Sequence, residues 1–187
     1  MAGEGYVLLL GAQSTVELLG LRGDPGEPLE LYRAALRRGG GRLLERLRRG
    51  LESGAVRSIV YLGADGALSR LLSRGVVEVY GAVSRLRCPR CGRRWWIDEG
   101  ERCPRCGGPG EPDYSETPRR RQLEEAIYEL TTAEAVAVHG LGEPPPVLGS
   151  VLALAASRFT RVSSSSRHRP SSGAWGSRRR ARPWRSS

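Results

Sequence analysis

Residues 76–112 have the sequence VVEVYGAVSRLRCPRCGRRWWIDEGERCPRCGGPGEP, and this stretch decides the fold. It carries every cysteine of the chain, in two C-P-R-C turns separated by eleven residues: Cys88, Cys91, Cys103 and Cys106. Each turn directs two thiolates at one point, and two such turns supply the tetrahedral ligand set of a zinc site. Four sulfur ligands leave no open position for water, so the spacing predicts a structural ion rather than a catalytic one.

Disulfide bridges, a redox-active C-x-x-C pair and free buried thiols are the alternatives to a metal. Two identical C-x-x-C units this close together favour zinc over all three. Gly92 and the glycine pair at 107–108 allow the backbone to turn after each cysteine pair, and residues 94–97 predict a short strand. The expected module is a zinc ribbon at residues 83–109.

The residues that flank the ribbon resemble the middle of the sirtuin family. There, V-I-E-L-H-G is followed by a strand, two C-x-x-C pairs, G-G and R-P-x-V-V-x-F-G-E. The positions in step with this pattern are Glu78, Gly81, the four cysteines, Gly107, Gly108, Pro112, Asp113 and Glu116. Tyr80 stands where the family has its catalytic histidine, which makes any catalytic role of Tyr80 doubtful.

The N-terminal segment has the pattern of a nucleotide-binding strand and turn. The apolar run Tyr6–Leu10 enters a turn of small residues, which is the usual opening of a doubly wound α/β sheet. Sirtuins open with a strand, G-A-G-I-S and G-I-P-x-F-R-G, and Gln13 replaces one of those glycines. The resemblance implies that the cofactor-binding positions in this segment are Gly11, Ala12, Ser14 and Arg22, with Thr15 as the alternative to Ser14 for the family's serine.

Two further strand ends resemble cofactor-binding segments of sirtuins. After the predicted strand 58–62, Asp65 matches the family's Q-N-I-D-G motif, whose asparagine and aspartate lie beside the nicotinamide ribose, but Gly63 replaces the asparagine. After the predicted strand 135–138, Gly140 matches G-T-S, whereas Leu141 and Gly142 replace its two hydroxyl residues. The resemblance therefore implies cofactor contacts at Asp65 and Gly140.

The spacing of apolar residues in the rest of the chain predicts the other helices and strands of an α/β fold. Helices are expected at 29–38, 42–52, after residue 66 through 74, at 119–130 and at 145–158, and further strands at 76–80 and 159–162. The arginines on the first two helices indicate a solvated face. We expect a Rossmann-like parallel sheet with helices on both faces and a small inserted zinc ribbon. The discontinuous Rossmann-like domain comprises residues 1–82 and 110–162.

The positive charge of the chain is distributed unevenly along the sequence. The formal net charge is +10 over 187 residues, yet the last 25 residues hold seven arginines and no acid, which leaves +3 for residues 1–162. The Arg/Ser-rich tail at 163–187 is expected to be disordered. A nucleic-acid-binding arm, a neutral extension and a frameshifted reading frame remain open for it, the last two being slightly favoured.

No apolar run approaches the length of a membrane span, and the N-terminus lacks a cleavable signal pattern. Thiols in C-x-x-C pairs without a secretion signal are typical of a reducing interior, so we expect a cytoplasmic protein. The two histidines, His139 at a strand end and His168 in the tail, are weak candidates for a chemical role.

The resemblance implies one structural zinc ion, NAD or ADP-ribose as ligand, and an acyl-lysine substrate or a protein partner. Because Tyr80 and Gly63 replace the family's histidine and asparagine, whether the chain is an enzyme stays open. The main hypothesis is a sirtuin-like protein with an NAD/ADP-ribose-type pocket and little or no NAD-dependent protein-lysine deacylase activity. An active, divergent deacetylase and a zinc-ribbon nucleic-acid-binding protein are the alternatives.

Overall fold

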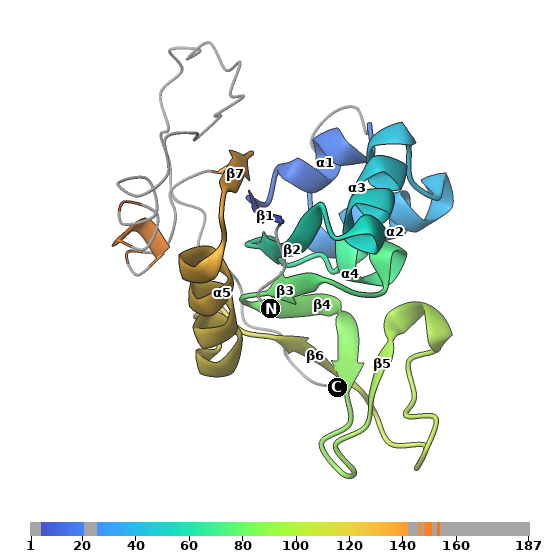
Figure 1. Cartoon of the computed structure of the whole chain (residues 1–187). Coiled ribbons are helices and arrows are strands. Elements are labelled where there is room, and N and C mark those ends of the chain that lie inside the picture. The colour runs from blue at the N-terminus through green and yellow to red at the C-terminus, as the bar shows by residue number, and fades with distance from the viewer. Residues whose placement is uncertain (1–4, 21–25, 142–145, 147, 151–152, 154–187) are drawn as a thin grey trace, which may run out of the picture.

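Two sheets organise the chain (Figure 1). The structure, a computed structural model, describes residues 5–20, 26–141, 146, 148–150 and 153. The larger sheet is parallel, with the strand order β3-β2-β1-β7. Its strands are β1 (Tyr6–Leu10), β2 (Val56–Tyr61), β3 (Val76–Glu78) and β7 (Val136–His139).

Helices cover both faces of this sheet, which confirms the predicted α/β architecture. On one face, a core cluster joins the sheet to α1 (Ser14–Leu18), α2 (Pro28–Arg38), α3 (Arg42–Ser53) and α4 (Ala67–Leu72). On the other face, a second cluster joins it to α5 (Arg120–Thr132), which lies apart from the other helices in Figure 1. The apolar side chains of β1 alternate between the two clusters, because successive residues of a strand point to opposite faces.

The smaller sheet is antiparallel and carries the cysteines in its loops. Its order is β5-β4-β6, formed by β4 (Gly81–Arg87), β5 (Arg94–Trp96) and β6 (Glu111–Tyr114), and the short 3-10 helix η1 (Ile97–Glu99) follows β5. Paired residues of β4 and β6 extend beyond the predicted ribbon limits of 83 and 109 at both ends.

Several predicted element ends differ from those in the structure, for local reasons. The helix after Asp65 ends at Leu72 rather than residue 74, because Ser73 adopts a left-handed backbone with φ of 66°. Strand β3 ends at Glu78 rather than Tyr80, and the chain turns at Gly81, where φ is 77°. The helix and strand expected at 145–158 and 159–162 fall largely or wholly outside the described residues, as does the tail. Within the described part of the chain, no helix is long and apolar enough to cross a membrane.

Candidate functional site

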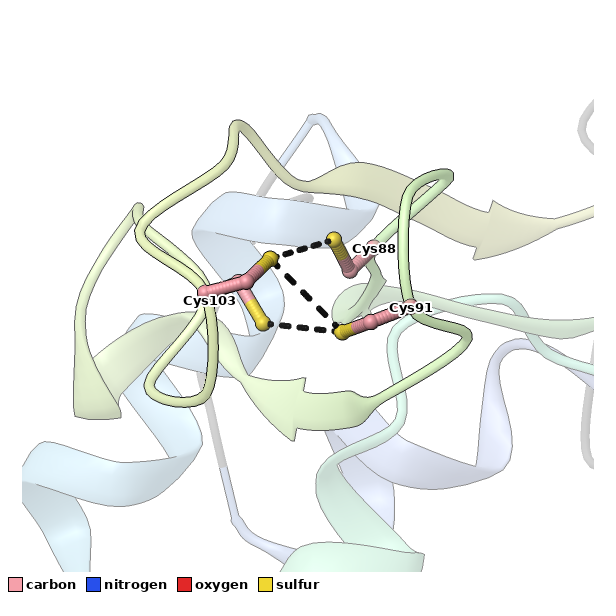
Figure 2. Close-up of side chains that lie close together, drawn as sticks. Cys88, Cys91 and Cys103 are labelled. Carbon is pink, nitrogen blue, oxygen red and sulfur yellow. Dashed lines mark hydrogen bonds between the residues drawn. The ribbon is translucent and has the colours of Figure 1, made fainter.

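The four cysteines form one cluster between their two turns (Figure 2). Their sulfur atoms all lie within 4.8 Å of one another, and the Sγ atoms of Cys88 and Cys106 are 3.5 Å apart, as are those of Cys91 and Cys103. Tetrahedral zinc with Zn–S bonds of about 2.3 Å requires sulfur separations of about 3.8 Å. None of the cysteines is bridged to another. The cluster is therefore arranged to bind a metal ion, as the spacing predicted.

Both cysteine turns are built in the same way. The N–H of Gly92 donates to the carbonyl of Cys88, and the N–H of Gly107 donates to that of Cys103, each at 2.9 Å. The two glycines have left-handed backbones with φ of 72° and 69°, a region that glycine enters without steric cost. Repetition of one turn geometry thus aims two cysteine pairs at a shared point.

Trp96 of β5 connects the ribbon to the helices beside the parallel sheet. Its ring stacks on Tyr32 of α2, with centroids 6.0 Å apart and planes inclined by 11°. The guanidinium carbons of Arg70 and Arg85 lie 5.6 and 5.5 Å from the ring centroid, within cation–π range. Asp98 of η1 adds an ion pair with Arg70 at 2.8 Å. Through Trp96 and Asp98, the ribbon therefore contacts α2 and α4 directly.

Asp113 of β6 connects the smaller sheet to the start of α5 through ion pairs. Its buried carboxylate contacts Arg119 at 2.6 Å, Arg94 at 2.8 Å and Arg85 at 3.4 Å. Burial by itself would raise the pKa of Asp113, but Arg119 first, and then Arg94 and Arg85, outweigh it and hold this pKa below its usual value. The carboxylate thus stays ionised and joins β4, β5 and the start of α5.

The carboxyl ends of the parallel strands form the edge of the larger sheet at which a ligand site is expected. Ligands of open α/β sheets bind at this edge, where the strand order reverses. Here the order runs from β1 through β2 to β3 and then crosses to β7, so that the reversal lies between β1 and β7. Gly11 and Gly140 follow these two strands, and a Cβ on Gly11 would lie only 1.8 Å from the carbonyl oxygen of Gly140. The two backbones are therefore in direct contact.

Most of the predicted cofactor-binding positions gather near this contact. Ser14 is buried and donates a hydrogen bond from its Oγ to the carbonyl of His139 at 2.8 Å. Ala12 and Gln13, in the turn between β1 and Ser14, are exposed. The structure thus brings together Gly11, Ala12, Ser14 and Gly140, whereas Arg22 lies outside the described residues.

Asp65 belongs to a buried cluster just inside the same edge, which we call the inner cluster: Thr15, Tyr61 and Asp65. The Tyr61 hydroxyl donates to Oδ2 of Asp65, and Oγ1 of Thr15 lies 2.5 Å from that hydroxyl and 3.4 Å from the same Oδ2. Oδ1 of Asp65 accepts the N–H of Ala67 at 2.7 Å. Burial raises the pKa of Asp65 and, with the Asp65 carboxylate, that of Tyr61.

Tyr80 lies in different surroundings from the inner cluster. Like Leu62 and Leu123, it is partly buried and packs against the core cluster on the α5 side of the sheet. Burial, and next the neighbouring Tyr114, raise the pKa of Tyr80 above its ordinary value of 10.0. At neutral pH the phenol is therefore protonated.

His139 is partly exposed at the end of β7. Its Nε2 lies 2.6 Å from Oε2 of Glu17 on α1, so the pair links the reversal point to the first helix. His168 lies outside the described residues.

No protein-family model and no curated protein matches the sequence, but solved structures do. A serine-to-alanine mutant of a Sir2 homologue in complex with ADP-ribose is similar with a TM-score of 0.60, at 16% identity, over 87% of this chain and 80% of that one. The chain has the sirtuin fold. Sir2 with the inhibitor EX-527, 2'-O-acetyl-ADP-ribose and deacetylated p53 peptide is similar with a TM-score of 0.54, at 19% identity, over 82% and 77%. A histidine-to-tyrosine mutant of Sir2 with p53 peptide and NAD gives 0.53, at 20% identity, over 83% and 78%.

The sirtuin fold implies NAD, but the nicotinamide end of NAD does not fit the residues present. The resemblance to sirtuins implies that Gly63 and Asp65 would lie beside the nicotinamide ribose. In this chain both carboxylate oxygens of Asp65 already accept hydrogen bonds within the protein. A Cβ on Gly63 would lie 1.9 Å from the hydroxyl oxygen of Tyr61, so Tyr61 occupies the space that a side chain at position 63 would need.

Sequence reasoning missed Tyr61, although one signal was available, and considered Thr15 only as an alternative to Ser14. A buried tyrosine generally requires a partner for its hydroxyl. Tyr61 ends the apolar run 59–61 of β2, and Asp65 follows four residues later. That spacing could have suggested the Tyr61–Asp65 pair, whereas the contact with Thr15 comes from a segment 46 residues away.

The glycine contact at the sheet edge of this sirtuin fold yields a stability prediction. We expect Gly11→Ala to lower the free energy of unfolding by about 1–3 kcal/mol, because the new Cβ meets backbone that must shift. Urea unfolding followed by circular dichroism measures the loss. Gly41→Ala is the control, since its Cβ would lie 4.0 Å from its nearest neighbour, and should cost less. Equal losses in the two variants would contradict the close contact.

Proposed function

We propose that this chain is a zinc-containing protein of the sirtuin fold that binds ADP-ribose-type ligands at the β1–β7 edge and has little or no NAD-dependent lysine deacylase activity. The observation that carries the loss of activity is the inner cluster, which occupies the carboxylate of Asp65 and the space at Gly63. Binding at the edge is supported by the position of the strand reversal and by ADP-ribose in a solved neighbour.

The surroundings of Tyr80 support the same proposal. In sirtuins a histidine at this position acts as general base on the ribose hydroxyl. A general base works best with a pKa near the operating pH and contributes about 10²–10⁴ in rate. Tyr80 is a phenol whose pKa is raised above 10.0, so it holds its proton at neutral pH and accepts none.

Ligand binding does not depend on that base. A Sir2 with a histidine-to-tyrosine substitution was solved with both p53 peptide and NAD. A change of this kind in the sirtuin fold is thus compatible with occupancy of the site. We assign zinc to the cysteine cluster because four sulfur ligands at tetrahedral separations suit that ion. An acyl-lysine peptide or another protein is the proposed partner, and a cytoplasmic location stays a prediction.

Two measurements test the proposed function. In a thermal-shift titration, ADP-ribose should raise the melting temperature of the full chain, because a ligand that binds only the folded state stabilises it. In a turnover assay with NAD and an acetyl-lysine peptide, neither the wild-type protein nor Tyr80→His should release nicotinamide above the protein-free rate. The histidine would restore a base, but the inner cluster would remain in place.

Two results would contradict the proposed function. Nicotinamide release by the wild-type protein that Tyr80→Phe abolishes would establish the active, divergent deacetylase instead. An unchanged melting temperature at millimolar ADP-ribose would remove the binding function and leave the fold and the metal cluster. Nucleic-acid binding by the tail at 163–187 stays a prediction, because those residues lie outside the described part of the chain.

A further inference from the structure

The first half of α3 carries a group of arginines on the side of the sheet opposite α5 (Figure 1). With the glycine run 39–41, they line an open hollow with a volume of about 550 Å³. The charged residues that line it are four arginines and one acid: Arg42, Glu45, Arg46, Arg48 and Arg49. The lining includes no residue of the β1–β7 edge, so this surface is separate from the proposed ADP-ribose site.

The positive charge of the hollow is only partly compensated. Glu45 forms an ion pair with Arg48 at 2.8 Å, and its distance to Arg49 is 3.8 Å. Arg48 also donates to the carbonyl of Leu71, so it is fixed against α4. The exposed guanidinium groups of Arg42 and Arg46 form no ion pair or hydrogen bond with any residue that the structure describes. Two arginines are therefore free to bind an anion, and Arg49 is held only weakly.

The stability of α3 does not explain this arrangement. Arg42 is the first residue of the helix and follows Gly41, which offers no side chain as a cap. A cation at a helix N-terminus opposes the helix dipole. Arg42 and Arg46 are also like charges four positions apart, which destabilises a helix further. Sequence features that break local rules in this way are expected where a protein binds a partner.

The chemistry of the hollow favours phosphate groups on a regular polymer. We call Arg42, Arg46 and Arg49 the arginine face, since their spacing places them on one side of α3 over about 10 Å. Guanidinium groups bind phosphate through two parallel hydrogen bonds. A nucleic-acid duplex carries one charge for about every 1.7 Å of its axis, so several phosphates lie within reach of this face.

The residues that line the hollow disfavour other partners. Leu44 is the only large apolar residue among them, and it is 2% exposed. Protein interfaces have apolar or aromatic centres that are depleted of charge, whereas this surface is charged throughout. Single-stranded nucleic acid is bound by stacking on aromatic rings, and no aromatic residue lines the hollow. The ribbon loops also carry exposed arginines, but the four thiolates there outweigh the charge of one zinc ion.

We propose that the arginine face of α3 is a second binding surface of this chain, which holds the phosphate backbone of a nucleic-acid duplex. Contacts to phosphates position a protein without reading bases, so binding is independent of sequence. The solvated face that the sequence predicts for these arginines is the surface that the duplex covers.

Fluorescence anisotropy of the full chain with short DNA duplexes of two unrelated sequences tests the proposal. Wild-type protein should bind both with equal affinity, and the logarithm of the affinity should fall linearly with that of the salt concentration over about 50–200 mM. In the triple variant Arg42→Gln/Arg46→Gln/Arg49→Gln the slope should become shallower by about three, one for each lost phosphate contact. Its affinity at about 100 mM salt should fall at least about tenfold.

The matched control removes the same charge from other exposed positions: Arg74→Gln/Arg87→Gln/Arg121→Gln. Its slope should change by less than about one, because these arginines lie on separate elements. The arginines of residues 163–187 are present in both triple variants, so their contribution cancels in the comparison. Glutamine is a good helix former, and circular dichroism should show both variants folded. Each single substitution of the arginine face should make the slope shallower by about one, which keeps the test valid if the triple variant unfolds.

Four results would overturn the proposal. These are equal slope changes in the two triple variants, no duplex binding by the wild-type protein at low salt, tighter binding of single strands than of duplexes, and tighter binding of phosphatidylserine vesicles than of DNA. None of them bears on ADP-ribose binding, since the hollow shares no residue with the β1–β7 edge.

Discussion

Removing the metal is expected to unfold the ribbon and to lower the melting temperature of the whole chain by at least about 10 °C. Structural zinc contributes about 10–16 kcal/mol of apparent binding free energy in zinc-finger peptides, and each kcal/mol shifts the melting temperature of a protein this size by about 2–4 °C. The loss should spread beyond the ribbon, because the stacking of Trp96 on Tyr32 and the Asp98–Arg70 ion pair hold α2 and α4.

A chelator titration followed by calorimetry and elemental analysis measures this effect. The protein as purified should contain one zinc ion per chain, and the melting temperature should fall as the zinc is removed. Added zinc should restore it, whereas added magnesium, which prefers oxygen ligands, should not. The variant Cys103→Ser should resemble the chelated protein. A metal-free protein that melts at the same temperature as the metal-bound one would contradict a structural role for the cluster.

Replacing Asp113 by asparagine should destabilise the protein by about 3 kcal/mol or more. Removing one partner of a buried ion pair typically costs about 3–5 kcal/mol, because the remaining charges lose their compensation. The carboxylate is 4% exposed and contacts Arg119, Arg94 and Arg85, so the substitution leaves three guanidinium groups facing a neutral amide. Chemical denaturation at neutral pH measures the change.

The pH dependence of stability provides a check on the same residue. The pKa of Asp113 is lowered in the folded state, so its contribution is present above the unfolded-state pKa of about 3.9 and is lost as pH falls through the lower folded-state value. Wild-type protein should therefore lose more stability below about pH 4 than Asp113→Asn does.

Glu124→Gln is the matched control for Asp113→Asn. Its carboxylate pairs with Arg120 on the exposed face of α5, and exposed pairs contribute about 1 kcal/mol or less. A loss in Asp113→Asn no larger than that in Glu124→Gln would show that the arginines around Asp113 are satisfied without it.

Features that depend only on short stretches of sequence could be predicted. The metal cluster follows from two C-P-R-C turns, because each turn is local and its glycine fixes the geometry. The parallel strands follow from continuous apolar runs such as Tyr6–Leu10, which need helices on both faces. The helical periodicity of α3 likewise follows from Leu44 and Leu47, which are buried, whereas Glu45 and Arg46 between them are exposed.

Contacts between distant segments could not be predicted from pattern alone. Trp96 and Tyr32 are 64 positions apart in the sequence, and no local period relates them. The inner cluster depends on the register of β1 against β2, which brings Thr15 beside Tyr61 only after the sheet has formed. Sequence reasoning therefore found which family residues had been replaced, but not that a tyrosine two positions before Gly63 fills the space.

We propose that this sirtuin fold lacks a working nicotinamide end of its site. A single-turnover experiment tests it most directly, with the protein in excess over NAD, an acetyl-lysine peptide present, and the products separated by chromatography. NAD should be recovered intact, and the peptide should stay acetylated. Stoichiometric free nicotinamide together with deacetylated peptide would contradict it.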